Sequence, residues 1–206
     1  MAVELNYKIV VIGDPMVGKS NLTAVFTGGE FTTDTNRTFG VDYVDTTLEI
    51  NSREVKLEIF DSAGQERYGP LVKSTYNGSH GALVVFDLTQ RATFEHVTKW
   101  LSDFRERAGH NPVVILVGNK SDLSDRAVAA AEADAFAREN GTGYFETSAK
   151  DGQNVQEVFK FLAQQIFNAV GDHTWKRERH GPQGPTVPVV LAPVDRKKDT
   201  GSKCKC

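Results

Sequence analysis

The stretch GDPMVGKS at residues 13–20 places two glycines, a lysine and a serine in the spacing G-x4-G-K-S. A loop of this kind binds phosphates when it follows a strand and opens a helix, because its backbone N–H groups and the helix N-terminus face the anion. The apolar run IVVI precedes the loop, and a helical pattern follows it as far as Gly28 and Gly29. In such a loop the lysine reaches the β- and γ-phosphates and the serine holds Mg²⁺. The candidate phosphate-binding residues are Gly13, Asp14, Pro15, Met16, Val17, Gly18, Lys19, Ser20 and Asn21.

Two residues in the middle of this loop are unusual. Pro15 has no backbone N–H and a φ fixed at about −65°, whereas Met16 keeps its N–H but carries a bulky thioether. We expect nucleotide binding to be normal and hydrolysis to be retained, or slowed if the proline ring crowds the attacking water. The alternative is a loop that binds nucleotide but has lost its chemistry.

A second motif, DSAGQE at residues 61–66, follows a predicted strand. A carboxylate at the end of a strand beside a phosphate loop can hold Mg²⁺, so Asp61 is a candidate metal ligand together with Ser20. Gly64 can offer its N–H to a γ-phosphate, and Gln65 can orient an attacking water. Gln65 is therefore the candidate catalytic residue, alongside Lys19.

Two further motifs indicate the base. NKSD at residues 119–122 directly follows the apolar run VVILVG, and ETSAK at 146–150 follows a short predicted strand. A carboxylate such as Asp122 can accept both N–H groups on the N1 and N2 edge of guanine, a pair that adenine lacks, which disfavours an ATP-using enzyme. The candidate base-binding residues are Asn119, Lys120, Asp122, Ser148, Ala149 and Lys150.

The elements that must position these motifs alternate along the chain. The run IVVI within residues 6–12 and the continuous apolar runs at 81–88 and 113–118 predict buried parallel strands, and 43–60 predicts an edge hairpin that turns at NSRE. Helical patterns cover 92–108, 125–139 and 153–169. We predict a three-layer α/β domain over residues 5–170, with a mostly parallel six-stranded sheet, helices on both faces and one antiparallel edge hairpin.

Residues 171–206 differ in character, being rich in proline and without helical periodicity, which predicts a largely disordered tail. The chain has a net charge of −3, and its tail, with eight basic and four acidic residues, carries +4 of positive charge. An acidic body with a basic tail argues against nucleic-acid binding and for a tail that meets an anionic surface. The only cysteines are Cys204 and Cys206, which excludes a disulfide framework in the body. The sequence shows no secretory signal and no membrane-spanning run, so we expect the newly made protein to be in the cytosol.

Over residues 5–170 the sequence resembles the small GTPases of the Ras superfamily, and it is most similar to the Rab family. The segments that carry the resemblance are FGVDY at 39–43, LEIFD at 57–61, QERY at 65–68, LVVFD at 83–87 and the Cys-Lys-Cys ending. The resemblance implies a Mg²⁺-dependent GTP/GDP switch for vesicle trafficking, with slow intrinsic hydrolysis that an activating protein accelerates. A hydrolysis-impaired GTP-binding scaffold is the alternative, and a Ras- or Rho-like signalling switch is disfavoured by the Cys-X-Cys end.

The resemblance also assigns roles in the segments that would switch. Thr38 would join Mg²⁺ and the γ-phosphate, which makes it a catalytic and metal-binding candidate, and Phe31 would lie against the guanine. Arg37 would be a solvated loop residue or an arginine finger supplied in cis. Effectors would read an aromatic trio in which two residues differ from the usual Phe and Trp, so the effector's identity stays open. This trio consists of Tyr43, Phe60 and Tyr76.

The C-terminus resembles a site of double geranylgeranylation on Cys204 and Cys206, because a final cysteine excludes a C-a-a-X signal. Two lipid chains hold a membrane far more firmly than one, and basic residues add attraction to anionic lipid. The resemblance implies a monomer that cycles between the cytosol and the cytoplasmic face of an intracellular membrane. Its implied partners are an exchange factor, an activating protein, an escort or dissociation inhibitor, and effectors. Residues 187–194 would dock on the escort or form an extended linker.

Overall fold

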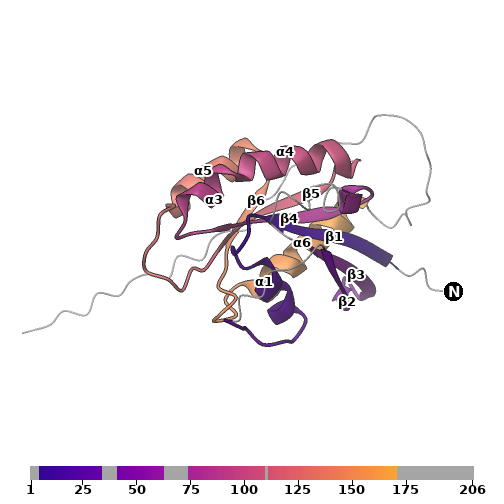
Figure 1. Cartoon of the computed structure of the whole chain (residues 1–206). Coiled ribbons are helices and arrows are strands. Elements are labelled where there is room, and N and C mark those ends of the chain that lie inside the picture. Colours follow the sequence, from indigo (N-terminus) through magenta and orange to yellow (C-terminus); the bar gives the residue numbers. More distant parts are fainter. Residues whose placement is uncertain (1–4, 34–40, 63–73, 110, 171–206) are drawn as a thin grey trace, which may run out of the picture.

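The computed structural model of the chain describes residues 5–33, 41–62, 74–109 and 111–170. A six-stranded sheet forms its middle layer, and helices cover both faces (Figure 1). The strands are β1 (Leu5–Gly13), β2 (Val41–Ile50), β3 (Arg53–Ser62), β4 (Gly81–Asp87), β5 (Val113–Asn119) and β6 (Gly143–Glu146). The helices are α1 (Lys19–Phe26), α3 (Arg91–Glu95), α4 (Val97–Ala108), α5 (Ala130–Glu139) and α6 (Val155–Val170). The predicted three-layer α/β fold is confirmed.

The central strands are buried on both faces, and their side chains alternate between two cores. In β1, Ile9 and Val11 belong to the core under α1 and α6, whereas Val10 and Ile12 belong to the core under α4 and α5. The same alternation continues through β4 and β5. A strand with helices on both sides needs apolar residues at every position, which explains the uninterrupted apolar runs in the sequence.

The sheet order β2-β3-β1-β4-β5-β6 decides where the functional motifs meet. β1 pairs in parallel with both β3 and β4, and β5 pairs in parallel with β4 and β6; β2 alone is antiparallel to its neighbour. The carboxyl ends of β1, β3, β5 and β6 therefore lie at one edge of the sheet. The helix after β1 (α1) and the helices after its neighbour β4 (α3 and α4) lie on opposite faces of the sheet. Such a switch point is where open α/β sheets bind ligands.

The edge hairpin is longer than the sequence predicts. β2 and β3 pair from Val41 opposite Ser62 to Ile50 opposite Arg53, so only Asn51 and Ser52 remain in the turn. Both turn residues have positive φ, 50° and 61°, as a two-residue type I′ turn requires. The predicted four-residue turn NSRE is thus corrected, because this turn matches the strand twist and lets Arg53 and Glu54 extend β3.

Two helix boundaries also differ from the prediction. The pattern at 92–108 is divided at His96 into α3 and α4, where the Lys99 N–H bonds the His96 carbonyl three residues back. α5 begins at Ala130 and not at 125, because the N–H groups of Ala127 and Val128 donate to the carbonyl of Leu88 instead of to a helical turn. At the start of α5, a contact with a distant segment therefore uses N–H groups that the sequence pattern assigns to the helix.

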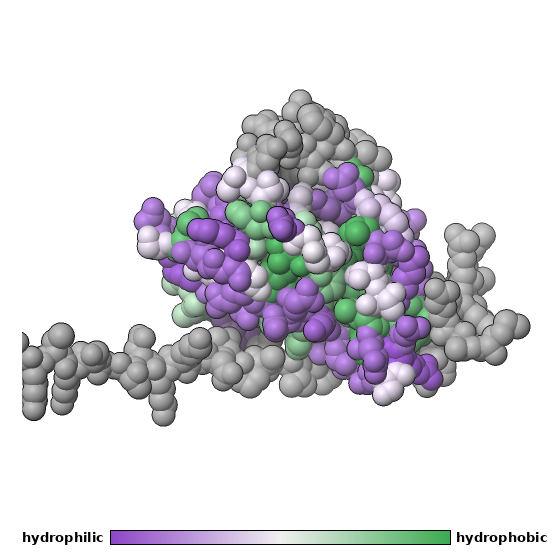
Figure 2. Space-filling view, turned by 90° about the horizontal axis from the view of Figure 1, so that it is seen from below, coloured by the Kyte–Doolittle hydropathy of each residue, from purple (hydrophilic) through white to green (hydrophobic). Residues whose placement is uncertain are grey.

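The surface of the described residues is mixed in character. Seen from below the view of Figure 1, hydrophilic residues surround separate groups of hydrophobic ones (Figure 2). None of the helices within the described ranges has the length and apolar character needed to cross a bilayer. The predicted tail lies outside the described residues, so the boundary at residue 170 stays a prediction.

His80 directly precedes β4, and both its backbone and its ring form hydrogen bonds with Lys8 of β1. Its N–H donates to the Lys8 carbonyl at 2.8 Å, and its Nδ1 accepts from the Lys8 N–H at 2.9 Å. Nδ1 can accept only while it carries no proton. Burial lowers the pKa of His80 below its usual value, so the folded protein favours the neutral ring.

This histidine should make stability depend on pH. Because its pKa is lower in the folded state than in the unfolded chain, the unfolded chain takes up more protons between the two values. We expect the free energy of unfolding to fall from pH 7.5 to pH 5.5, measured by urea titration. His80→Asn, whose Oδ1 can accept the same N–H without titrating, should show a smaller fall. An equal fall in both proteins would contradict the assignment.

Candidate functional site

The glycines of the loop between β1 and α1 allow close contact with two neighbouring strands. Gly13 has φ +140°, and a Cβ there would lie 2.1 Å from the Val85 carbonyl oxygen of β4. Gly18 has φ +97°, and a Cβ there would lie 2.3 Å from Nδ2 of Asn119 at the end of β5. Both positions combine a left-handed backbone with contact distances that only glycine tolerates. The phosphate-loop pattern thus also reflects the packing of this loop on β4 and β5.

Lys19, the first residue of α1, is buried inside this loop. Its Nζ donates to the carbonyl oxygens of Gly13 at 3.0 Å and Asp14 at 2.7 Å. Burial lowers the pKa of Lys19 to about 8, against the opposing attraction of Asp61 and Asp14. The loop therefore holds a cation at its centre, and an anion placed there would favour the charged form.

Pro15 and Met16 lie on the outside of the loop. Pro15 is exposed, and the Met16 side chain is 49% exposed. The φ of Met16 is 65°, a left-handed conformation that costs a side-chain-bearing residue about 1–2 kcal/mol. Because both side chains lie at the surface, they leave the buried lysine and its carbonyl partners undisturbed.

Ser20 and Asp61 come together from α1 and β3. The Ser20 hydroxyl donates to Oδ2 of Asp61, while Oδ1 of Asp61 is buried and has no hydrogen-bond partner among the described residues. The residue is 3% exposed, and burial raises the pKa of its carboxyl to about 6 despite the hydrogen bond from Ser20 and the charge of Lys19. A buried carboxylate oxygen without a partner is costly, and a cation would satisfy it.

This pair of oxygens suits Mg²⁺, which takes one or two protein oxygens and completes its shell with water and substrate phosphates. Within the described ranges, no group of three or more histidine, cysteine or acidic side chains could hold a metal ion. The third predicted ligand, Thr38, lies outside the described residues.

Asn119, the last residue of β5, bonds two loops, the phosphate loop and the loop after β6. Its Nδ2 donates to the Val17 carbonyl of the phosphate loop at 2.8 Å. Its Oδ1 accepts from Thr147 Oγ1 at 3.1 Å and from the Ala149 N–H at 3.3 Å, both beyond β6. The side chain is buried, so these bonds meet little competition from water. Asn119, which is predicted to bind the base, holds the phosphate loop and the loop after β6 together in the structure.

Asp122 and Ser148 lie beside this junction. Ser148 Oγ donates to Asp122 Oδ1 at 2.8 Å, and Lys150 Nζ lies 3.9 Å from Asp122 Oδ2. A carboxylate offers about four acceptor sites, so these two contacts leave it able to accept further N–H groups. The structure therefore brings the NKSD and ETSAK motifs together, as their order along the chain predicts.

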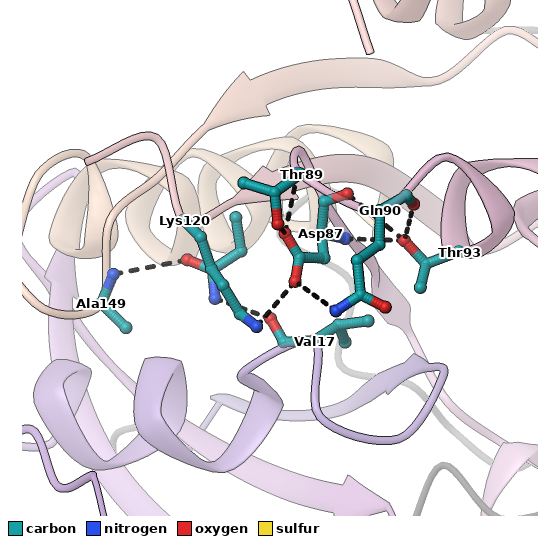
Figure 3. A network of polar contacts seen from close by, with 8 residues as sticks. Val17, Asp87, Thr89, Gln90, Thr93, Lys120 and Ala149 are labelled. Atoms are coloured by element: carbon teal, nitrogen blue, oxygen red, sulfur yellow. Dashed lines mark hydrogen bonds and ion pairs between the residues drawn. The ribbon is translucent and has the colours of Figure 1, made fainter. Parts of the chain in front are cut away.

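Asp87, at the end of β4, is a buried residue that our sequence reasoning did not assign to the site. Its Oδ1 accepts from the N–H and the hydroxyl of Thr89, and its Oδ2 accepts from Gln90 and pairs with Lys120 Nζ at 2.6 Å (Figure 3). The amine of Lys120, predicted to bind the base, is thus held by Asp87. The signal available was the aspartate that ends the apolar run GALVVFD, the same pattern that identifies Asp61.

Asn21 holds the segment that follows α1. Its Nδ2 donates to the Thr32 carbonyl at 3.0 Å, and its Oδ1 accepts from the Thr32 N–H at 3.1 Å. This reciprocal pair fixes residues 31–33 against α1 and leaves Phe31 exposed. Asn21 is predicted to bind nucleotide, and in the structure its side chain bonds the segment that carries Phe31.

The three aromatic residues predicted to form one surface are not together. Tyr43 is 52% exposed and its ring lies 5.2 Å from that of Phe60, over which Lys8 Nζ lies at 5.0 Å. Tyr76 is instead fully buried, 5.4 Å from the ring of Phe104 in the core under α4. The structure does not place Tyr76 on the surface that Tyr43 and Phe60 form, because its ring fills that core.

The remaining predicted residues fall outside the part of the chain that the structure describes. They are Arg37, Thr38, Gly64, Gln65, Cys204 and Cys206. Their roles stay predictions.

Comparisons with known proteins agree with this geometry. The model of the Ras family matches residues 8–168. The chain is 40% identical over 203 residues to the GTP-binding protein ypt3 of Schizosaccharomyces pombe, covering 96% of this chain and 95% of that protein. It is 46% identical over 169 residues to the Ras-related protein RABA4b of Arabidopsis thaliana, covering 82% of this chain and 75% of that one.

The contact between Gly18 and Asn119 can be tested with a matched pair of glycine substitutions. Gly28 also has positive φ, +87°, but a Cβ there would meet nothing within 4 Å. Gly28→Ala should lower the free energy of unfolding by the backbone cost alone, about 1–2 kcal/mol. Gly18→Ala should cost about 1–3 kcal/mol more, because it also displaces the buried Asn119 amide from Val17. Urea unfolding measures both, and equal losses would contradict the role of the Asn119 contact.

Proposed function

The chain belongs to the Ras family of small GTPases, with Rab proteins among its relatives, and we propose that it is a Rab switch of vesicle trafficking. It binds guanine nucleotide and hydrolyses GTP. In the GTP-bound form it recruits effectors to an intracellular membrane. One observation carries this proposal: buried Lys19, the Ser20–Asp61 pair, Asn119 and Asp122 all lie at one edge of the sheet. Asn119 bonds the phosphate loop there, and Asp122 bonds Ser148 in the loop after β6.

The base pocket is proposed to select guanine through Asp122. Its carboxylate accepts the N1 and N2 hydrogens of the base, while Ala149, whose own N–H donates to Asn119, and Lys150 contribute to the pocket from the loop after β6. Asn119 supports this arrangement by holding the loops of Val17 and Ala149 at fixed distance. An adenine in this pocket would leave the partly buried carboxylate without the two N–H donors that guanine supplies, which is costly.

The phosphates are proposed to bind over Lys19, with Mg²⁺ held by Ser20, Asp61 and Thr38. When bound, Mg²⁺ would neutralise negative charge on the phosphates. The fit is supported by the buried Asp61 Oδ1, which lacks a hydrogen-bond partner within the described part of the chain. Lys19 keeps its charge close to the phosphates because two backbone carbonyls orient its Nζ.

Hydrolysis is proposed to use Gln65 to orient the attacking water, with Lys19 and Thr38 binding the γ-phosphate. The exposed positions of Pro15 and Met16 support a working site, since neither side chain occupies the centre of the loop. We expect a slow intrinsic rate that an activating protein accelerates. Arg37 is expected to be a solvated loop residue.

GTP is proposed to act as a switch by holding Thr38 and Gly64 through its γ-phosphate. These contacts order the segments at roughly 31–43 and 62–76, and hydrolysis releases both. The bond between Asn21 and Thr32 fixes the start of the first segment to α1. An exchange factor, an activating protein, an escort and effectors would each recognise one of these states.

Membrane attachment is proposed to use two prenyl groups on Cys204 and Cys206, assisted by the basic residues of the tail. Two chains and a basic segment together give firm yet releasable binding to an anionic leaflet. The protein would act as a monomer and bind no nucleic acid. A Ras- or Rho-like signalling switch remains the less favoured alternative because of the Cys-X-Cys end.

The base selectivity depends on one carboxylate. Asp122→Asn should weaken GDP binding by about two orders of magnitude and improve binding of xanthosine diphosphate, because the new amide donor faces the xanthine 2-oxygen. Asp125→Asn, which neutralises an exposed carboxylate of the same loop, is the matched control and should change neither affinity. Competition titration measures both nucleotides, and unchanged GDP binding by Asp122→Asn would disprove the assignment.

The state of the chemistry is tested by single-turnover GTP hydrolysis of the purified protein, beside Gln65→Leu and Pro15→Gly. We expect slow but measurable hydrolysis by the wild type and none by Gln65→Leu, which cannot orient water. Pro15→Gly should retain hydrolysis. If the wild type is as inactive as Gln65→Leu while Pro15→Gly is active, the proline has disabled the site. The protein would then be the scaffold, or a switch wholly dependent on its activating protein.

A further inference from the structure

The carboxylate of Asp14 points to a link between the phosphate loop and α4. Its Oδ1 accepts from Trp100 Nε1 at 2.7 Å, and its Oδ2 lies 2.6 Å from His96 Nδ1. The Asp14 side chain is only 16% exposed, although its loop lies at the surface. Asp14, His96 and Trp100 are called the Asp14 bracket below. Asp14 lies 82 positions from His96 and 86 positions from Trp100 in the sequence.

The two donors stand on a rigid element. His96 and Trp100 are one helical turn apart, with the Trp100 N–H bonded to the His96 carbonyl at 3.2 Å, so their side chains lie on the same helix face. Trp100 also packs against the core under α4, in which Val97, Leu101 and Phe104 are buried. The carboxylate is therefore held by Trp100, which packs against the core, and by the exposed His96 one helical turn before it.

Asp14 also takes part in the phosphate-binding centre through its backbone. Its carbonyl accepts from Lys19 Nζ at 2.7 Å, the shorter of the two bonds that orient this amine. The next two residues are the rigid Pro15 and the left-handed Met16. A shift of Asp14 would move the carbonyl that orients Lys19. It would also release a negative charge beside the place where phosphates bind, and like charges repel.

We propose that His96 and Trp100 are positioning residues that act through Asp14 to slow the release of nucleotide. The bracket fixes the carbonyl partner of Lys19 and keeps the Asp14 carboxylate occupied with donors, away from the nucleotide's own negative charge. This inference rests on the proposed function, since it assumes that Lys19 binds the β-phosphate of a guanine nucleotide. It assigns part of the affinity to Trp100 of α4 and to His96 at the N-cap of that helix, both outside all the nucleotide-binding motifs.

The experiment compares the full-length wild type with Trp100→Phe, His96→Ala and the double variant. Phenylalanine keeps a smaller aromatic ring against the core and removes the indole donor. Dissociation of fluorescently labelled GDP is followed at fixed Mg²⁺ concentration, and we expect the double variant to release it about tenfold faster, as for loss of hydrogen bonds to a charged group. GMP has no β-phosphate for Lys19, so its affinity, measured by competition, should change less than about twofold.

Thr98→Ala, at an exposed position of the same helix, is the matched control and should leave the release of GDP unchanged. Adding Asp14→Asn to Trp100→Phe should restore part of the slow release, because it removes the freed charge. His96 is 58% exposed, so His96→Ala is expected to fold even if Trp100→Phe does not, and its release rate alone then tests the bracket.

The inference is overturned if GDP release is unchanged in all variants, or if GDP and GMP lose affinity by the same factor, which would indicate general loosening of the domain. If the wild type itself fails to bind GDP, the proposed function fails and this inference fails with it. A selective loss for GDP, with partial recovery by Asp14→Asn, supports the bracket.

Discussion

The arrangement of the candidate site depends on one buried side chain, the amide of Asn119 at the end of β5. It is the common partner of the phosphate loop and of the loop after β6, through Val17, Thr147 and Ala149. A primary amide can donate in one direction and accept from another, so a single residue can hold two loops that have no direct bond in this network. Removing it would leave a buried carbonyl and a buried N–H without partners, and this cost keeps the loops in place.

The site also concentrates charges that a folded protein normally keeps in water. Lys19, Asp61 and Asp87 are all buried at strand ends or helix starts, and each is compensated differently. Asp87 is satisfied within the protein by Thr89, Gln90 and Lys120. Lys19 and Asp61 are satisfied in part, and the burial that lowers one pKa and raises the other reflects this deficit. A ligand that carries both phosphate and a divalent cation would supply the missing charges, so binding and stability should be strongly coupled.

The two cores of the domain contribute differently to this site. The core under α1 and α6 supports Lys19 and Asn21 through α1, and the core under α4 and α5 supports His96 and Trp100 through α4. The phosphate loop lies between them, bonded to α4 by the carboxylate of Asp14 and to β5 through Val17. A change in either layer can therefore reach the loop through specific hydrogen bonds, without a rearrangement of the sheet.

The sequence by itself determined the fold class, the positions of the apolar strands and the polar motifs at their carboxyl ends. These features are local, since each strand must be apolar on both faces and each motif must follow a strand. Only the tertiary structure decided which partners the polar side chains take. Asn21 bonds Thr32, Lys120 pairs with Asp87, Asp14 bonds α4, and Tyr76 enters a core instead of a surface. The tertiary structure also decided that α5 begins at Ala130, because the Leu88 carbonyl accepts the N–H groups of Ala127 and Val128, which the sequence pattern assigns to the helix. A residue's type fixes what it can donate or accept, but the distance to a partner tens of residues away is set by how the layers pack.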